Sequence, residues 1–393
     1  MRLCTLTLAF LLTGTGSPAA QSPATPSKPS SAPSPAASFD DVARRAAEAR
    51  EAHRTQEAIS LYRRAVEVRP SWDEGWWDLG TLLYEKDRYA EAVPAFRTFM
   101  ELKPQVGAGW ALLGLCELET ARYEPARDHL RRGLSLGLGT NDELLRVARR
   151  AFSLAAIKTG LFELAIEPLM VLSVTAPRTP SLADAIGLAL LRMAVLPSEV
   201  GEARRDLVRR VGEAGFLQFA QSTEDPLPAF RAVTEAYPDE PWVHYLYAVV
   251  LRRSDGDLAL AELRRELTVQ PDNVYAHLQI AFELLSRADP AGARPHAERA
   301  VALAPGLFAT HHTLGRVFVE AGEVEAGLRE LEDAARLAPE SAPTQFALAQ
   351  AYARLGREAD SSAARARFAA LQKTQQERQW TSPGGGITEP SLP

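Results

Sequence analysis

The sequence predicts an all-α fold, a solenoid of helical hairpins that repeat about every 34 residues. One pattern recurs clearly: residues 76–80 read WWDLG and residues 110–114 read WALLG. No stretch of four to eight residues alternates polar and apolar side chains, as a half-buried strand would. A chain of 393 residues would also stretch a single globular core, whereas each unit of a solenoid packs only on its neighbours.

The first block of repeats is expected over residues 39–179. Repeats begin near residues 39, 73 and 107, and a fourth with a shifted phase covers roughly 146–179. An alanine in the second half of a unit, such as Ala92 or Ala126, allows the two helices to pack closely. Prolines such as Pro70 and Pro104 end the second helix and direct the chain into the next unit.

The repeat register breaks over residues 180–206, where we expect an irregular helical insert that joins two blocks. The apolar stretch from Leu182 to Val195 predicts one helix, which Pro197 would end. The second block is expected over residues 207–375, with repeats near 207, 241, 274, 308 and 342. Its last helix turns polar and continues as a cap to about residue 380.

The repeated residues resemble the tetratricopeptide repeat, a helix-turn-helix unit of 34 residues. The resemblance rests on three stretches, which are Trp76-x2-Leu79-Gly80 with Ala92, Phe96 and Pro104; Trp110-x2-Leu113-Gly114 with Ala126 and Leu130; and His311-x2-Leu314-Gly315 with Phe318, Leu331, Ala334 and Pro339. It implies a right-handed α-solenoid. Small residues at the eighth position of a unit would let its two helices approach, namely Gly80, Gly114, Ala248, Ala281, Gly315 and Ala349.

The two ends of the chain have compositions unlike the repeats. Residues 1–20 combine Arg2, an apolar stretch and small residues before position 21, which predicts a secretory signal peptide. We therefore expect an exported protein, periplasmic or secreted. Residues 21–38 are rich in proline, serine and alanine and predict an extended linker, and residues 381–393 predict a disordered tail. No later segment is apolar enough over about 20 residues to cross a membrane.

Charge and cysteine content exclude several classes of function. The net charge of -6 comes from 44 basic and 50 acidic residues that are mixed along the chain. Because no run of lysine or arginine would follow a phosphate backbone, we expect no nucleic-acid partner. Cys4 would leave with the signal peptide, so Cys116 has no partner for a disulfide and no paired cysteine for a metal or redox site. No cofactor motif is present, and we expect no cofactor.

One motif carries the letters of a hydrolase site. Residues 133–137 read GLSLG, which matches the G-x-S-x-G nucleophile elbow with Ser135 at its centre. That motif works at a sharp turn from a strand into a helix, whereas Ser135 is expected near the end of a second helix. We therefore expect no catalytic residue and no enzymatic activity. His296 and Glu298 are expected on a solvated helix face.

Three histidines recur at repeat spacing. His244, His277 and His311 are separated by 33 and 34 residues, at the position that Trp76 and Trp110 occupy in earlier units. Equivalent points on stacked helices lie about 8–10 Å apart, whereas the ligands of one zinc ion lie within roughly 4 Å of each other. The three histidines therefore cannot share an ion, and we expect no metal. They are interpreted as packing residues, with a pH-sensitive interface as the alternative.

The resemblance implies a binding surface, because the first helix of each tetratricopeptide unit lines a concave groove. Transfer of the groove positions to this chain predicts partner-binding residues at Trp77, Tyr84, Trp242, Tyr245, Arg252, Tyr275, Phe282, His312, Arg316 and Phe346. Aromatic side chains and arginine often anchor protein interfaces. For each ring, packing within its own repeat is the alternative role. The lysine and asparagine residues of carboxylate-clamp repeats are missing, since Trp77 and Thr81 stand at such positions.

These observations together predict an exported scaffold that binds protein or peptide segments in its groove, for the assembly of a cell-envelope complex. The first alternative is an accessory subunit or regulator of an envelope enzyme such as a transferase or protease. The second is a spacer whose groove is idle. The residues do not identify the partner.

Overall fold

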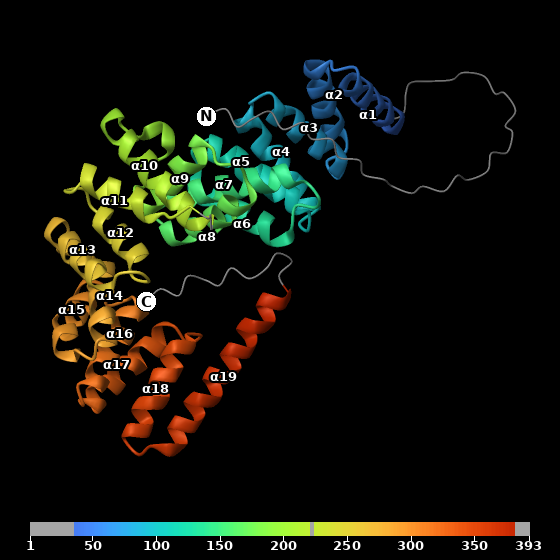
Figure 1. The fold of residues 1–393 in the computed structure, drawn as a ribbon. Coiled ribbons are helices and arrows are strands. Elements are labelled where there is room, and N and C mark those ends of the chain that lie inside the picture. Colours follow the sequence, from blue (N-terminus) through green and yellow to red (C-terminus); the bar gives the residue numbers. More distant parts are fainter. Residues whose placement is uncertain (1–34, 221–223, 382–393) are drawn as a thin grey trace, which may run out of the picture. The chain divides into compact units, whose positions relative to one another are not determined.

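The computed structural model describes residues 35–220 and 224–381. The predicted signal peptide, most of the predicted linker and the predicted tail lie outside these ranges. Every regular element within them is a helix (Figure 1), which confirms the all-α fold class. The chain divides into two compact units, Met1–Arg204 and Arg205–Pro393, and each is described by itself.

The first unit contains four helical hairpins followed by a single helix and a short 3-10 helix. Its elements are α1 (Pro35–Glu51) with α2 (Thr55–Val68), α3 (Asp73–Glu85) with α4 (Tyr89–Leu102), α5 (Gly107–Glu119) with α6 (Tyr123–Leu136), α7 (Asp142–Lys158) with α8 (Phe162–Thr175), then α9 (Pro180–Leu190) and η1 (Pro197–Glu199). The two helices of each hairpin pack on each other, and each hairpin packs on the next.

The second unit contains two less regular helices and then four hairpins. Its elements are α10 (Glu202–Phe219), α11 (Leu227–Ala236), α12 (Val243–Leu251) with α13 (Gly256–Val269), α14 (Val274–Ser286) with α15 (Pro290–Leu303), α16 (Phe308–Glu320) with α17 (Val324–Leu337), and α18 (Ala342–Arg354) with α19 (Glu358–Thr381). The first turn of α10 contains the division between the units.

Small residues at the eighth position let the helices of a hairpin touch, as the sequence predicts. Gly80, Gly114 and Gly315 are buried, and a Cβ atom at each would lie 2.7–2.8 Å from a side chain of the partner helix. Ala248 and Ala281, at the same position of later units, have no exposed surface. A larger residue at these positions would therefore push the two helices apart.

Most hairpin turns begin with the same left-handed residue. His53, Asp87, Ala121 and Ala288 have φ angles of 56–58°, and Gly160, Gly322 and Gly356 take the same place in their turns. The amide that follows each of them donates to a carbonyl five residues earlier, as Arg88 N does to Leu83 O at 2.9 Å. This bond and the left-handed residue form a Schellman cap, which satisfies the end of the first helix.

The predicted helix from Leu182 to Val195 is shorter in the structure. Helix α9 ends at Leu190, because Arg192 adopts a φ of 52° and the amide of Met193 donates to Leu188 O at 3.0 Å. This is the same Schellman cap that ends the first helices of the hairpins. A left-handed arginine, rather than Pro197, therefore ends the helix.

Two helix positions differ from simple expectation. Helix α1 begins at Pro35, inside the predicted linker, since proline suits the first turn of a helix. Helices α10 and α11, predicted to form a weak repeat, lack the extensive mutual contact of the other hairpins. Helix α10 also spans the predicted border at residue 206, so the domain limits stay predictions.

The first helices line the inner side of each unit. In the second unit α14 contacts α16, and α16 contacts α18, whereas the second helices α13, α15 and α17 have no mutual contact of that extent. In the first unit α5 likewise contacts α7, and α7 contacts α9. Helices that lie closer together form the inner side of a curved stack, so the first helices form the concave side within each unit (Figure 1).

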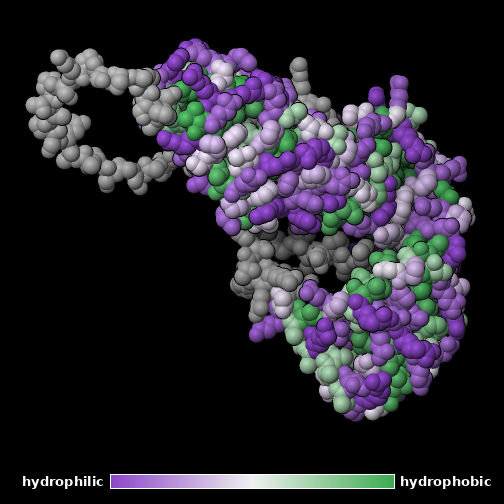
Figure 2. All heavy atoms as spheres, turned by 180° about the vertical axis from the view of Figure 1, so that it is seen from behind, coloured by the Kyte–Doolittle hydropathy of each residue, from purple (hydrophilic) through white to green (hydrophobic). Residues whose placement is uncertain are grey.

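The face seen in Figure 2 is mostly hydrophilic, and hydrophobic residues reach it in patches among polar ones. Among the described helices, none has both the length and the apolar character needed to cross a bilayer.

Candidate functional site

Ring N–H groups at one position of the repeat link it to the end of the preceding repeat. In five units the ring at the fourth position donates to the carbonyl of the proline six residues earlier, namely Trp76 to Pro70 (2.8 Å), Trp110 to Pro104 (2.9 Å), His244 to Pro238 (2.9 Å), His277 to Pro271 (3.0 Å) and His311 to Pro305 (2.9 Å). A carbonyl oxygen only accepts, so each histidine carries a proton on Nε2. Either tryptophan or histidine can stand at this position because both offer a ring N–H.

The second ring nitrogen of each histidine also has a partner. Nδ1 of His244 lies 2.5 Å from Glu262 Oε2, and Nδ1 of His311 lies 2.7 Å from Glu330 Oε2. Nδ1 of His277 lies 3.0 Å from Nδ1 of His296. His296 is therefore half-buried and paired, which corrects the expectation of a solvated face. Desolvation lowers the pKa of His277, and desolvation and the neighbouring His277 lower that of His296 to about 4.

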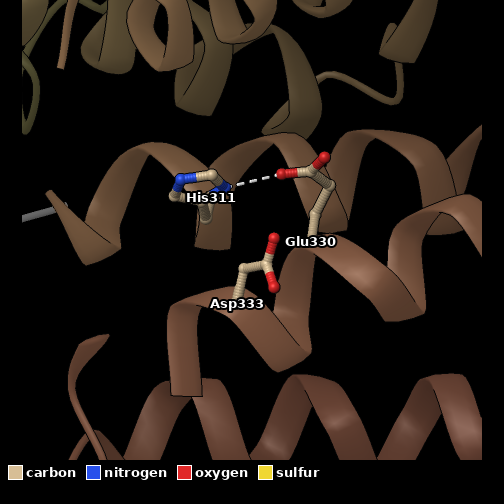
Figure 3. A group of neighbouring side chains, drawn as sticks. All are labelled: His311, Glu330 and Asp333. Carbon is tan, nitrogen blue, oxygen red and sulfur yellow. Dashed lines mark hydrogen bonds and ion pairs between the residues drawn. The ribbon is translucent and has the colours of Figure 1, made fainter. Parts of the chain in front are cut away.

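His311, Glu330 and Asp333 are the one group in the described ranges whose side chains could surround a metal ion, with ligand atoms within 4.8 Å of one another. His311 projects from α16, and the two carboxylates project from adjacent turns of α17 (Figure 3). Their hydrogen bonds are complete without an ion. Glu330 pairs with His311, the other ring nitrogen binds Pro305, and Asp333 pairs with Arg336. The group serves to join α16 to α17.

Eight of the predicted partner-binding residues lie on the first helices of the second unit or, for Trp242 and Arg252, at the two ends of α12. We call them the inner face: Trp242, Tyr245, Arg252, Tyr275, Phe282, His312, Arg316 and Phe346. Three aromatic rings gather at one end of it. Trp242 lies 5.5 Å from Tyr245 and 5.8 Å from Tyr275 between ring centroids. Tyr245 and Tyr275 are 6.4 Å apart. All three rings are partly exposed, so they form one aromatic surface across α12 and α14.

Two arginines flank the next ring of the inner face. The guanidinium carbon of Arg252 lies 5.2 Å from the centroid of Phe282, and that of Arg316 lies 5.7 Å from the same centroid. Both distances are within the range of a cation–π interaction. Phe282 is half-buried, Arg252 is exposed and Arg316 is half-exposed. Three successive first helices thus contribute to one group of two positive charges around an aromatic ring.

A hollow of about 390 Å³ lies at the far end of the inner face, between α16 and α18. His312, Arg316, Glu320, Phe346 and Gln350 line it, together with aliphatic side chains such as Val319. Phe346 is 49% exposed and also contacts Phe368, at 5.4 Å between ring centroids. The hollow therefore combines an exposed ring with one arginine and with Glu320, whose carboxylate is paired with Arg354.

His312 lies at the bottom of this hollow and is uncharged at neutral pH. Its side chain is 8% exposed, and its Nδ1 lies 3.3 Å from the hydroxyl of Thr344. Desolvation, and then the positive charge of Arg316, lower the pKa of His312 to about 4. At neutral pH the histidine is uncharged, so Arg316 carries the positive charge here.

A buried carboxylate sets the position of Trp242. Trp242 has a φ of 73°, a left-handed conformation that is rare for a bulky residue. Glu266 on α13 has no exposed surface and accepts from the amides of Trp242 (2.8 Å) and Tyr245 (3.2 Å). It also accepts from Nδ2 of Asn273 at 3.1 Å. The negative charge at the N-terminus of α12 thus stabilises the strained residue that starts the aromatic surface.

Sequence reasoning missed Glu266, although its position carries a signal. It stands at a position of the second helix where four other repeats have a small residue, namely Ala65, Gly133, Ala300 and Ala334, and where two have Phe99 and Phe368. All four small residues are buried. A glutamate in such a place requires a buried partner, and the partner here is the start of α12.

Parts of this chain are similar to known proteins. The family model described as tetratricopeptide repeat matches residues 43–106 and 78–139. Residues 43–139 therefore match tetratricopeptide repeats. No curated protein matches it in sequence.

Among solved structures, a MamA double mutant (RS-1 ArsTM) is 19% identical, with a TM-score of 0.39, and the match covers 44% of this chain and 97% of that one. MamA from Desulfovibrio magneticus RS-1 is 19% identical, with a TM-score of 0.38, and 45% and 98% are covered. Cut9 with Hcn1, from the APC/C hetero-tetramer, is 14% identical, with a TM-score of 0.39 and coverage of 84% and 66%.

In the tetratricopeptide repeats of the first unit, the two predicted partner-binding residues pack inside the protein. Tyr84 is 7% exposed, and its ring lies 5.5 Å from that of Tyr89. Trp77 is half-buried against Phe96 and Phe99 of α4, at 6.1 and 5.1 Å between ring centroids. Both rings thus make contacts within their own repeat. The structure therefore gathers the predicted residues on the second unit, and their binding role stays a prediction.

Ser135 and Cys116, whose residue types can act as nucleophiles, both take part in helix packing or helix hydrogen bonds here. Ser135 lies in the last turn of α6 and donates to Arg132 O at 2.8 Å, so no strand-to-helix elbow exists at this serine. Gly133 of the same motif packs against Ala111 and Gly107 of α5. Cys116 is fully buried, and desolvation raises the pKa of its thiol. A protonated, inaccessible thiol is a packing residue.

Proposed function

We propose that this protein is an exported scaffold that binds a protein or peptide segment on the inner face and thereby assembles a complex in the cell envelope. The observation that carries the proposal is the gathering of aromatic rings and arginines on the first helices of four consecutive repeats. Such residues commonly dominate binding energy in interfaces. Export is supported by the composition of residues 1–20.

Binding would use the stack as a rigid display surface without chemical turnover. Repeat arrays of this kind form extended concave surfaces, and neighbouring units each contribute a few contacts. The aromatic surface around Trp242, the ring of Phe282 and the hollow beside Phe346 would each take one part of an extended or helical segment.

The test is affinity capture from a native envelope extract. Replacement of Trp242, Tyr245 and Phe282 by alanine should abolish capture of the partners, whereas the milder Phe346→Ala should weaken it. Leu337 on α17 is 46% exposed, an exposed fraction similar to the 49% of Phe346. Leu337→Ala is therefore a matched control outside the inner face. Equal capture by all variants, with unchanged circular dichroism, would refute the proposal. Export is tested separately by fusing residues 1–38 to a reporter that is active only after export.

A further inference from the structure

We infer that the inner face binds an internal acidic segment, in which one or more Asp or Glu residues meet Arg252 and Arg316 and a neighbouring aromatic or aliphatic side chain enters the hollow beside Phe346. This inference rests on the proposed function and specifies the chemistry of the partner. It comes from the charges around Phe282 rather than from the presence of a groove.

The two arginines have no acidic partner among the described residues. In the described ranges neither Arg252 nor Arg316 forms an ion pair with a carboxylate. Nearby carboxylates are already paired, since Glu283 binds Arg287 at 2.8 Å and Glu320 binds Arg354 at 3.3 Å. Two positive charges therefore share one ring without local neutralisation.

The surroundings increase the effect of these charges. The guanidinium groups lie on an aromatic surface that is partly removed from water, where a charge interacts more strongly than in bulk solvent. His312 adjoins Arg316 but is neutral, so the positive charge here comes from the arginines alone. The planar donors of arginine fit a carboxylate with two parallel hydrogen bonds.

An apolar anchor has its place directly beside the charges. Arg316 belongs both to the pair around Phe282 and to the lining of the hollow. The hollow of about 390 Å³ falls near the lower end of the range of small-ligand pockets, roughly 300–1,000 Å³. A segment that places a carboxylate at Arg316 would therefore bring an adjacent residue to the hollow. A chain terminus is not required, because both features accept side chains.

The experiment is a selection from a random 12-residue peptide library, displayed internally so that no free carboxyl terminus is present. The bait is the full chain, and parallel selections use Phe282→Ala and the double variant Arg252→Gln/Arg316→Gln. The control is Arg329→Gln/Arg365→Gln, which removes the same charge from exposed arginines on the second helices α17 and α19.

We expect peptides rich in Asp and Glu beside an aromatic residue or leucine. Their affinity should fall about tenfold or more in the double variant, and by less than about twofold in the control. A synthetic peptide with Asn and Gln in place of its acidic residues should bind both proteins equally weakly. Binding of the acidic peptide should also weaken between 0.05 and 0.5 M salt.

Two results would overturn the inference and have different meanings. Selected peptides that depend on Phe282 but carry no acidic residues would contradict the acidic partner and leave the proposed function in place. Selected peptides that bind equally to wild type and Phe282→Ala would place binding elsewhere and contradict both.

Discussion

Glu266 should be the residue on which the aromatic end of the inner face depends most. Three donors converge on its carboxylate, namely the amides of Trp242 and Tyr245 and the side chain of Asn273. Glu266→Ala leaves all three without a charged acceptor. Each hydrogen bond to a charged group contributes roughly 1.5–3 kcal/mol, and water that enters the vacated space would accept from some of the three donors and recover part of this energy. We expect the free energy of unfolding to fall by about 3–5 kcal/mol.

The alanine substitution is informative because three other repeats have alanine at this position. Ala300 and Ala334 occupy it in later units and are fully buried, so a small side chain fits there without a clash. A loss of stability can therefore be assigned to the missing carboxylate. Glu266→Gln should cost about 2 kcal/mol, since one of its oxygens becomes a donor that faces a donor.

Urea denaturation followed by far-UV circular dichroism measures the stability change, and hydrogen exchange with mass spectrometry measures the local effect. The amides of Trp242 and Tyr245 should exchange slowly in wild type and fast in Glu266→Ala. Glu298→Ala is the control, because its side chain is 49% exposed and pairs only with Arg294 in a surface ion pair. Equal denaturation midpoints for Glu266→Ala and Glu298→Ala, with unchanged exchange at Trp242, would refute this reasoning.

Three further predictions follow from other contacts. Because the pKa of His312 is lowered in the folded protein, the unfolded chain takes up a proton at this residue first as pH falls from about 6.5 to 4. The free energy of unfolding should therefore fall in that window by up to about 3 kcal/mol, and by less in His312→Asn. Thermal melts measured against pH would show the difference. Gly114→Ala places a Cβ 2.7 Å from Leu130 and should cost about 1–3 kcal/mol in urea denaturation, whereas Gly306→Ala meets nothing within 4 Å and should be neutral. His311→Trp keeps a ring N–H for the preceding carbonyl, so it should be about 1 kcal/mol more stable than His311→Phe, and equal stabilities would contradict the shared donor role.

The hairpins could be predicted from sequence because their determinants are local and periodic. Gly80, Gly114 and Gly315 mark where two helices touch, and the structure places each against a side chain of its partner helix. The row of Trp76, Trp110 and the histidines was recognised as a repeat feature, yet its common hydrogen bond to a proline carbonyl was not. The bond depends on the loop between units, where the pattern of apolar residues carries no information.

Other features depend on contacts between distant residues. The left-handed Trp242 is held by Glu266, which is 24 residues away, and no local propensity of tryptophan predicts it. Arg192 ends α9 although arginine is a good helix former. The inner face was predicted from repeat positions. The predicted groove positions of the two units nevertheless differ in their surroundings, because Phe96 and Phe99 cover Trp77 in the first unit, whereas Phe282 lies between two arginines in the second.

Site-specific photo-crosslinking tests the central claim most directly. A photoreactive phenylalanine analogue would replace either Phe346 on the inner face or Leu337 on the second helix α17, whose exposed fractions are 49% and 46%. After illumination in native envelope extract, the account predicts a discrete crosslinked partner from position 346 and none from position 337. Crosslinks of equal strength from both positions, or from position 337 alone, would contradict it.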